Sequence, residues 1–149
     1  MEYENLNQLN HRYIGLFKKA FDNFLSNGYY VLGDEVKSFE KEFASYIGVR
    51  FCVGVASGLD ALQLSLEVLD LPKGSEILVS SNSYIASILS IVRAGHIPVL
   101  VEPTLESYNI DPKRIEERIT KKTRAILPVH LYGKISEMDL IIEIANKYN

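Results

Sequence analysis

The spacing of apolar residues changes near residue 50 and divides the chain into two parts. In the first part, apolar residues recur at steps of three and four, which predicts amphipathic helices. The first predicted helix ends at Asn27-Gly28 and carries Leu9, Tyr13, Leu16, Phe17, Ala20, Phe21 and Phe24. The second follows Gly33, with Asp34 as its expected N-cap and an apolar face of Val36, Phe39, Phe43, Tyr46 and Ile47. We expect residues 1–50 to form an N-terminal helical segment that packs on the main domain.

From residue 51 onward, short apolar runs alternate with helical patterns. The runs predict strands over 51–55, 76–80, 97–102 and 124–130, and the patterns between them predict helices over about 59–69, 83–94 and 112–119. Asp111-Pro112 is a strong helix start, and Ser136-x-x-Asp139 predicts a capping box that opens a last helix. This alternation is typical of an α/β fold with a mainly parallel sheet and flanking helices. A further strand normally follows such a helix, so we expect residues 51–149 to form an incomplete domain.

The turn at Ser57-Gly58-Leu59 joins the first predicted strand to its helix. Because a helix N-terminus presents unpaired backbone N–H groups and a positive partial charge, this turn is a candidate phosphate site. Gly58 would let the backbone approach the phosphate, whose oxygens the N–H groups of Gly58 and Leu59 would bind. Alternatively, Gly58 only makes a tight turn. The glycine fingerprint of dinucleotide-binding folds and the P-loop are both absent.

Two further side chains are predicted at the same carboxyl edge of the sheet, where ligands of open α/β sheets bind. Tyr84 follows the second strand, where an aromatic ring can stack on a flat cofactor, although a core role is the alternative. His130 closes the fourth strand and can contact a ligand or hydrogen-bond a neighbouring loop. Glu102 could face the same cleft or brace the loop 104–109.

Composition excludes several functional classes. The net charge of -3 gives no reason to expect nucleic acid, and the single cysteine excludes an internal disulfide. The three histidines have no metal-binding spacing, so we expect no metal site. Neither a signal peptide nor an apolar run long enough to span a bilayer is present, which predicts a cytoplasmic protein without membrane partners.

Six segments together resemble the DegT/DnrJ family of pyridoxal phosphate (PLP)-dependent sugar-nucleotide aminotransferases. They occur in the family's order and at compatible spacings across nearly the whole chain. The segments lie at 30–36, 39–49, 54–62 (Gly-Val-Ala-Ser-Gly-Leu-Asp-Ala-Leu), 81–86 (Ser-Asn-Ser-Tyr-Ile-Ala), 108–112 and 128–133 (Pro-Val-His-Leu-Tyr-Gly). Their amino-acid sequences are most similar to those of members that aminate dTDP-3-keto-6-deoxyhexoses.

The resemblance implies a fold, a cofactor and roles for particular residues. The fold would be the N-terminal part of the large domain of an aspartate-aminotransferase-like PLP enzyme. Ser57, Gly58 and Leu59 would bind the PLP phosphate, and Tyr84 would stack on the pyridine ring. Tyr29, Tyr30, Gly33 and His130 are implied as substrate-binding residues. The Schiff-base lysine would fall beyond the point that matches Asn149, so no catalytic residue is assigned here.

These implications define the expected function and its alternatives. The complete protein would transfer an amino group, with glutamate as donor, to a keto sugar nucleotide for surface polysaccharide biosynthesis, and would act as a homodimer. The 149-residue chain alone is expected to be inactive. One alternative is a PLP-dependent sugar dehydratase of the same family, and another is a non-catalytic remnant of the α/β unit. A generic nucleotide-binding domain would leave the other segments unexplained.

Overall fold

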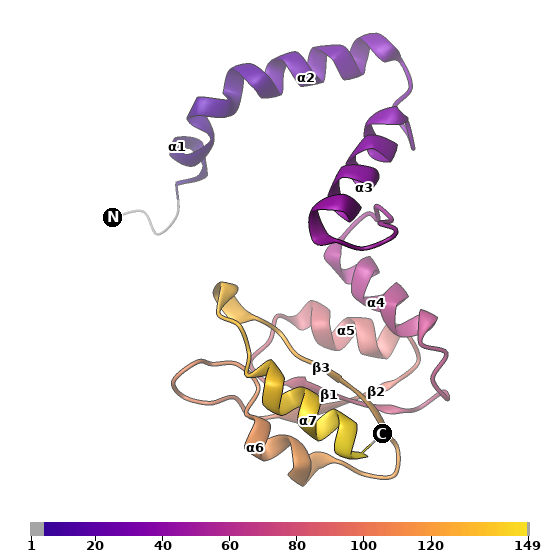
Figure 1. The fold of residues 1–149 in the computed structure, drawn as a ribbon, viewed down its shortest axis with the longest axis vertical. Coiled ribbons are helices and arrows are strands. Elements are labelled where there is room, and N and C mark those ends of the chain that lie inside the picture. The colour runs from indigo at the N-terminus through magenta and orange to yellow at the C-terminus, as the bar shows by residue number, and fades with distance from the viewer. Residues whose placement is uncertain (1–4, 149) are drawn as a thin grey trace. The chain divides into compact units, whose positions relative to one another are not determined.

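The computed structural model describes residues 5–148, which form two compact units that divide between Gly54 and Val55. The N-terminal unit is helical (Figure 1): it contains α1 (Leu6–Asn10), the 3-10 turn η1 (His11–Tyr13), α2 (Ile14–Asn27) and α3 (Asp34–Ile47). Gly28 and Gly48 follow α2 and α3 with φ of 68° and 78°, left-handed values that glycine adopts without steric cost. The predicted end of the first long helix at Asn27-Gly28 is confirmed.

The start of α3 differs from the prediction by one residue. Gly33, not Asp34, is the N-cap, and the Gly33 carbonyl accepts a hydrogen bond from Lys37 N at 3.3 Å. Asp34 is the first helical residue, and its carboxylate accepts from Lys37 Nζ at 2.9 Å instead of capping the helix. This hydrogen bond, helped by the lysine's charge, lowers the pKa of Asp34.

The C-terminal unit is built around a parallel sheet of three strands. The strands β1 (Glu76–Ser80), β2 (Ile97–Val101) and β3 (Thr123–Leu127) are arranged in the order β2-β1-β3. Figure 1 shows α4 (Gly58–Val68) and α5 (Ile85–Arg93) on one side of this sheet, and α6 (Pro112–Ile115) and α7 (Met138–Tyr148) on the other. The 3-10 turns η2 (Glu116–Arg118) and η3 (Leu131–Gly133) complete the unit. The predicted α/β class, with a parallel sheet and flanking helices, is confirmed.

The central strand β1 sends alternate side chains into two separate hydrophobic clusters. Ile77 and Val79 are buried in a cluster with Leu66 of α4 and Ile91 of α5. Leu78 is buried on the opposite face, in a cluster completed by Val101, Ile110, Ile115 and Ile141. Because side chains alternate along a strand, one five-residue strand holds both helical layers.

The predicted strand over 51–55 is not formed. These residues are irregular and pair with none of the described strands, and the side chains of Phe51 and Val53 are exposed. An apolar run becomes a strand only when a neighbouring strand satisfies its backbone groups and packs against its side chains. Residues 51–55 have no such neighbour here.

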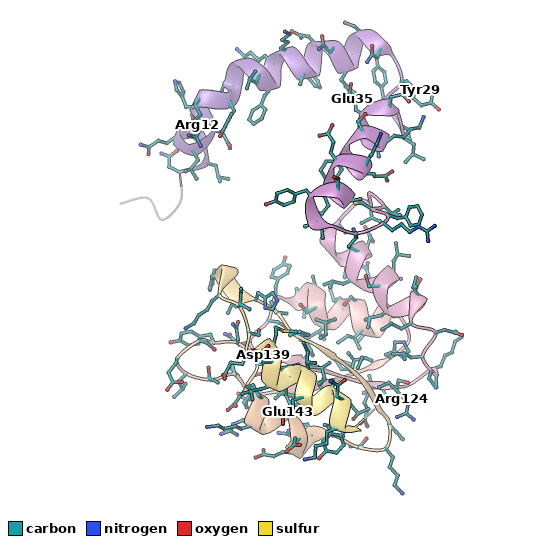
Figure 2. All side chains as sticks on the ribbon, in the orientation of Figure 1. Arg12, Tyr29, Glu35, Arg124, Asp139 and Glu143 are labelled. Atoms are coloured by element: carbon teal, nitrogen blue, oxygen red, sulfur yellow. The ribbon has the colours of Figure 1, made fainter. Side chains whose placement is uncertain are left out.

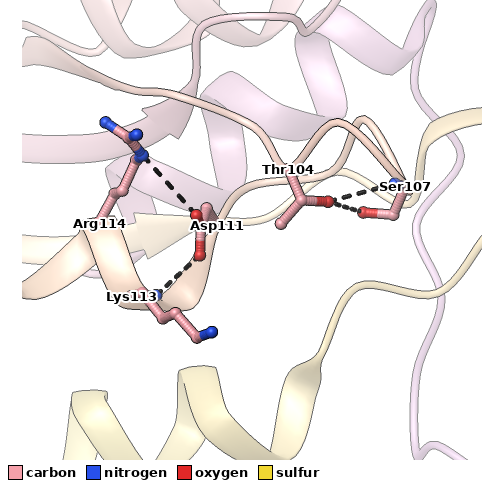
Figure 3. Close-up of polar contacts among 5 residues, drawn as sticks. All are labelled: Thr104, Ser107, Asp111, Lys113 and Arg114. Atoms are coloured by element: carbon pink, nitrogen blue, oxygen red, sulfur yellow. Dashed lines mark hydrogen bonds and ion pairs between the residues drawn. The ribbon is translucent and has the colours of Figure 1, made fainter.

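Two predicted helix starts had different outcomes. Asp111 caps α6 as predicted (Figure 3), accepting from Lys113 N at 3.0 Å and lying 3.7 Å from Arg114 Nε, with Pro112 as the first helical residue. The capping box at Ser136 is wrong, because α7 begins only at Met138. The backbone N–H of Ser136 donates to His130 Nδ1 and its hydroxyl donates to the carbonyl of Val129, so neither group caps the helix.

None of the helices within residues 5–148 combines the length and the apolarity needed to cross a membrane.

Candidate functional site

A groove runs along the N-terminal parts of α4 and α5. Its volume is about 800 Å³, and its walls are formed by Ser57, Gly58, Leu59, Ala61, Leu62 and Ser65 from one side and Tyr84, Ile85, Ala86, Ser87 and Leu89 from the other. The groove therefore brings together the predicted phosphate turn and the predicted stacking residue, which are 25 or more positions apart in the sequence.

The α4 side of the groove is a capped helix N-terminus. Ser57 is extended (φ -157°, ψ 164°), and its hydroxyl accepts from Asp60 N at 3.2 Å and donates to the Asp60 carboxylate at 2.7 Å. Within residues 5–148, the N–H groups of Gly58 and Leu59 have no hydrogen-bond partner. A Cβ added to Gly58 would meet no atom within 4 Å, so the space beside this turn is open to a ligand.

The α5 side supplies a second helix N-terminus and an aromatic ring. Tyr84 is the residue before α5, and its side chain is 77% exposed. The N–H groups of Ile85 and Ala86 also lack a partner among the described residues. Unpaired N–H groups and the positive ends of two helices therefore border one groove, which favours an anionic ligand.

The chemistry of the groove is limited to binding and orientation. Its lining contains no acidic, basic, histidine or cysteine side chain. An anion would therefore be held by backbone N–H groups, while the Tyr84 ring and the leucine and isoleucine side chains contact an apolar body. This arrangement suits a flat ring that carries a phosphate. Within residues 5–148, no cluster of three or more metal-ligating side chains is found.

His130 lies outside the residues that line this groove. It follows β3 by three residues, on an exposed loop at the carboxyl edge of the sheet, and its Nδ1 accepts from Ser136 N at 3.1 Å. The observed hydrogen bond joins two residues of the same loop, so neither a ligand contact nor a bond from His130 to a neighbouring loop is seen among the described residues. Glu102 likewise accepts a backbone hydrogen bond, from Asp111 N to its carbonyl, and its side chain is exposed.

Three of the residues implied as substrate-binding belong to the N-terminal unit. Figure 2 shows Tyr29 at the turn that joins α2 to α3. Tyr30 packs its ring against Phe24 (centroids 5.0 Å apart) and donates its hydroxyl to the carbonyl of Leu25 at 3.1 Å. Gly33 is buried, and a Cβ there would lie 2.8 Å from the carbonyl oxygen of Tyr29, so the tightness of this turn requires glycine.

Sequence reasoning missed the role of Asn109 and assigned Ser136 to a helix cap, whereas both are buried polar residues that hold the loop after β3. Asn109 lies in the segment Tyr108–Pro112, which was singled out only for its resemblance to a family. The hydrogen-bond partners of the Asn109 side chain are 22 and 25 residues away, so no local pattern reveals them.

Comparison with known protein families and proteins places these features in context. Residues 14–149 match the DegT/DnrJ/EryC1/StrS aminotransferase family. The chain is 52% identical over 145 residues to the dTDP-3-amino-3,6-dideoxy-alpha-D-galactopyranose transaminase of Aneurinibacillus thermoaerophilus, covering 97% of this chain and 40% of that protein. It is 46% identical over 129 residues to the dTDP-3-amino-3,4,6-trideoxy-alpha-D-glucose transaminase of Streptomyces venezuelae, covering 87% of this chain and 34% of that protein.

Solved structures show the same likeness. S. venezuelae DesV, in complex with a ketimine intermediate, superposes with a TM-score of 0.90 at 42% identity, covering 97% of this chain and 39% of DesV. NtdA from Bacillus subtilis, with bound cofactor PMP (pyridoxamine phosphate), superposes with a TM-score of 0.83 at 37% identity, covering 87% of this chain and 30% of NtdA. The chain thus spans well under half the length of these relatives.

Proposed function

Because the chain belongs to the DegT/DnrJ/EryC1/StrS aminotransferase family, we propose that it is part of an enzyme that transfers an amino group to a keto sugar nucleotide, with PLP as cofactor. The observation that carries this proposal is the groove between α4 and α5, where two helix N-termini and Tyr84 meet. The relatives' names support amino transfer to a sugar.

The residues of the groove fit the two halves of the cofactor. The N–H groups of Gly58 and Leu59 would hold the phosphate, at a helix start that the Ser57 hydroxyl caps. The exposed ring of Tyr84 would stack on the pyridine ring and fix its plane. When bound, the cofactor supplies an electron sink for the carbon that gains or loses the amino group. The part of the protein described here would anchor and orient that cofactor.

The finer details of the reaction are also part of the proposal. A dTDP-keto-deoxyhexose is the proposed substrate, because two of the most similar relatives carry dTDP-amino-sugar names. Glutamate is the proposed amino donor, and Tyr29, Tyr30, Gly33 and His130 are proposed substrate contacts. We further propose that the 149-residue polypeptide alone binds cofactor without turnover, since no lysine lines the groove to form a Schiff base.

Pyridoxamine phosphate is the ligand that tests this site, because it carries the ring and the phosphate but cannot form a Schiff base with a stray lysine. We expect the 149-residue polypeptide to bind it in a calorimetric titration. Replacing Tyr84 by Leu should weaken binding by about 2- to 10-fold, which corresponds to the roughly 0.5–1.5 kcal/mol of an aromatic pair. The matched control is Tyr132→Leu, at an exposed tyrosine outside the groove.

The phosphate contact is tested by removing one N–H group. Gly58→Pro deletes that donor at the first position of α4, where proline is well tolerated, and Ser57 already has the extended conformation that proline requires before it. We expect weaker binding of pyridoxamine phosphate and little change in the binding of pyridoxamine, which lacks the phosphate. Equal affinity of the two ligands for the wild type would contradict the proposed phosphate site.

A further inference from the structure

The loop after β3 is fixed by one buried asparagine. Asn109 is 2% exposed, and its side-chain oxygen accepts from Leu131 N at 3.0 Å while its side-chain nitrogen donates to the carbonyl of Lys134 at 2.7 Å. The amide oxygen and the amide nitrogen of Asn109 therefore both hydrogen-bond to the loop that follows β3. Lys134 Nζ adds a hydrogen bond to the carbonyl of Glu106 at 3.2 Å.

Asn109 itself lies in a hydrogen-bonded turn. In Figure 3 the hydroxyls of Thr104 and Ser107 lie together, 2.7 Å apart, and Thr104 Oγ1 also accepts from Ser107 N. Thr104 N donates to the carbonyl of Asn109, and an antiparallel bridge between Pro103 and Ile110 closes the base of the turn. The asparagine thus connects two loops of the C-terminal unit, and one of them carries His130.

The hydrogen bond from Ser136 to His130 determines which ring nitrogen carries the proton. A backbone N–H can only donate, so Nδ1 of His130, which accepts from Ser136 N at 3.1 Å, must be unprotonated. The Ser136 hydroxyl is engaged with the carbonyl of Val129 at 3.1 Å. In a neutral imidazole the proton is then on Nε2, which has no hydrogen-bond partner within residues 5–148.

We propose that Asn109 and Ser136 are positioning residues that hold His130 as a neutral Nε2–H donor for an acceptor oxygen of the sugar nucleotide. This inference rests on the proposed function. His130 follows β3 and Tyr84 follows β1, and these neighbouring parallel strands end at the same edge of the sheet. A histidine held in this tautomer presents its Nε2–H to substrate as a hydrogen-bond donor.

Nitrogen-15 NMR of histidine-labelled polypeptide tests the tautomer directly. Under mildly alkaline conditions, where histidine side chains are neutral, His130 should show an unprotonated Nδ1 and a protonated Nε2, as a single tautomer. The signal is assigned by its loss in His130→Gln, which separates it from His11 and His96. A tautomer mixture, or a protonated Nδ1, in the wild-type polypeptide would overturn the proposal.

Two variants separate positioning from general folding. Ser136→Ala keeps the backbone N–H and should leave the His130 tautomer unchanged. Asn109→Asp keeps the shape and the acceptor for Leu131 N but removes the donor to Lys134, and should turn the single His130 tautomer into a mixture while pyridoxamine phosphate binding at the groove persists. An unchanged tautomer in folded Asn109→Asp would remove Asn109 from the proposal.

The substrate part is tested with thymidine diphosphate glucose as the probe. Its addition should shift the Nε2–H resonance of wild-type His130, and no shift would refute the substrate contact. Failure of the proposed function would look different, because pyridoxamine phosphate would then fail to bind while the His130 tautomer remained fixed.

Discussion

Because Gly33 has no side chain, the chain can turn tightly between α2 and α3. The carbonyl oxygen of Tyr29 lies where a Cβ would stand, 2.8 Å away, and the Tyr29 ring lies at 3.2 Å. The φ of Gly33 is -73°, which any residue can adopt, so the requirement for glycine here is one of space and not of backbone conformation.

Replacing Gly33 by Ala should therefore destabilise the N-terminal unit, by about 1–3 kcal/mol for an overpacked site. Gly15→Ala is the matched control, because Gly15 lies within α2 and a Cβ there meets nothing within 4 Å. That change should instead stabilise the helix by roughly 0.5–1 kcal/mol. Thermal unfolding followed by circular dichroism measures both, and a harmless Gly33→Ala would show that the turn can open.

At the same scale, the sequence pointed to those candidate residues whose position depends on immediate neighbours. Ser57, Gly58 and Leu59 form a local turn, and Tyr84 stands at a strand-to-helix junction. All four line one groove, and their roles stay a prediction. Asn109 could not be found in this way, because its function depends on backbone groups 22 and 25 residues away.

At the scale of elements, most helices and strands lie within a few residues of their predicted positions, because each has its own periodicity and end signals. The strand predicted over 51–55 failed for a different reason. Its apolar residues favour a strand, but a strand also needs a partner, and none of the described strands pairs with it. Partner availability is a property of the fold and not of the segment.

The contact between η2 and α7 gives a pH dependence at this scale. Lys147 Nζ donates to Glu116 Oε1 at 2.7 Å; this hydrogen bond lowers the pKa of Glu116 and raises the pKa of Lys147. The stabilisation from Glu116 is lost as pH falls through its lowered folded-state pKa. The stabilisation that Lys147 contributes is lost as pH rises through the raised folded-state pKa of Lys147.

Glu116→Gln should therefore cause a small fall in the thermal midpoint near neutral pH that disappears in strong acid. The effect should be small because both side chains are substantially exposed. Glu117→Gln, at the next residue of the same 3-10 turn, is the control and should leave the midpoint unchanged. A pH-independent difference between Glu116→Gln and the wild type would argue against the ion pair as its cause.

At the scale of the whole molecule, burial differs sharply between the two units. Among residues 5–54 only Gly33 and Ala44 are buried, and α2 buries none of its residues. In the C-terminal unit, by contrast, the side chains of Ile77, Leu78 and Val79 are fully buried in β1. Local stability follows the amount of apolar surface removed from water.

Hydrogen exchange should therefore separate the units in the 149-residue polypeptide. We expect the amides of α2 to exchange rapidly, and those of β1 to exchange only on unfolding of the C-terminal unit. Mass spectrometry of peptic fragments gives both rates in one experiment. Comparable protection of α2 and β1 would mean that α2 is covered, and would support the expected packing of the N-terminal segment or self-association.

The order β2-β1-β3 also has a consequence for synthesis on the ribosome. The central strand β1 emerges first. Its edge toward β3 stays unpaired until Thr123, which follows Glu76 by 47 residues, has been synthesised. Translation at about 5–20 residues per second makes that interval some seconds long. Throughout that interval, the strand that is most buried in the folded sheet has a free edge to which a chaperone or another nascent chain can bind.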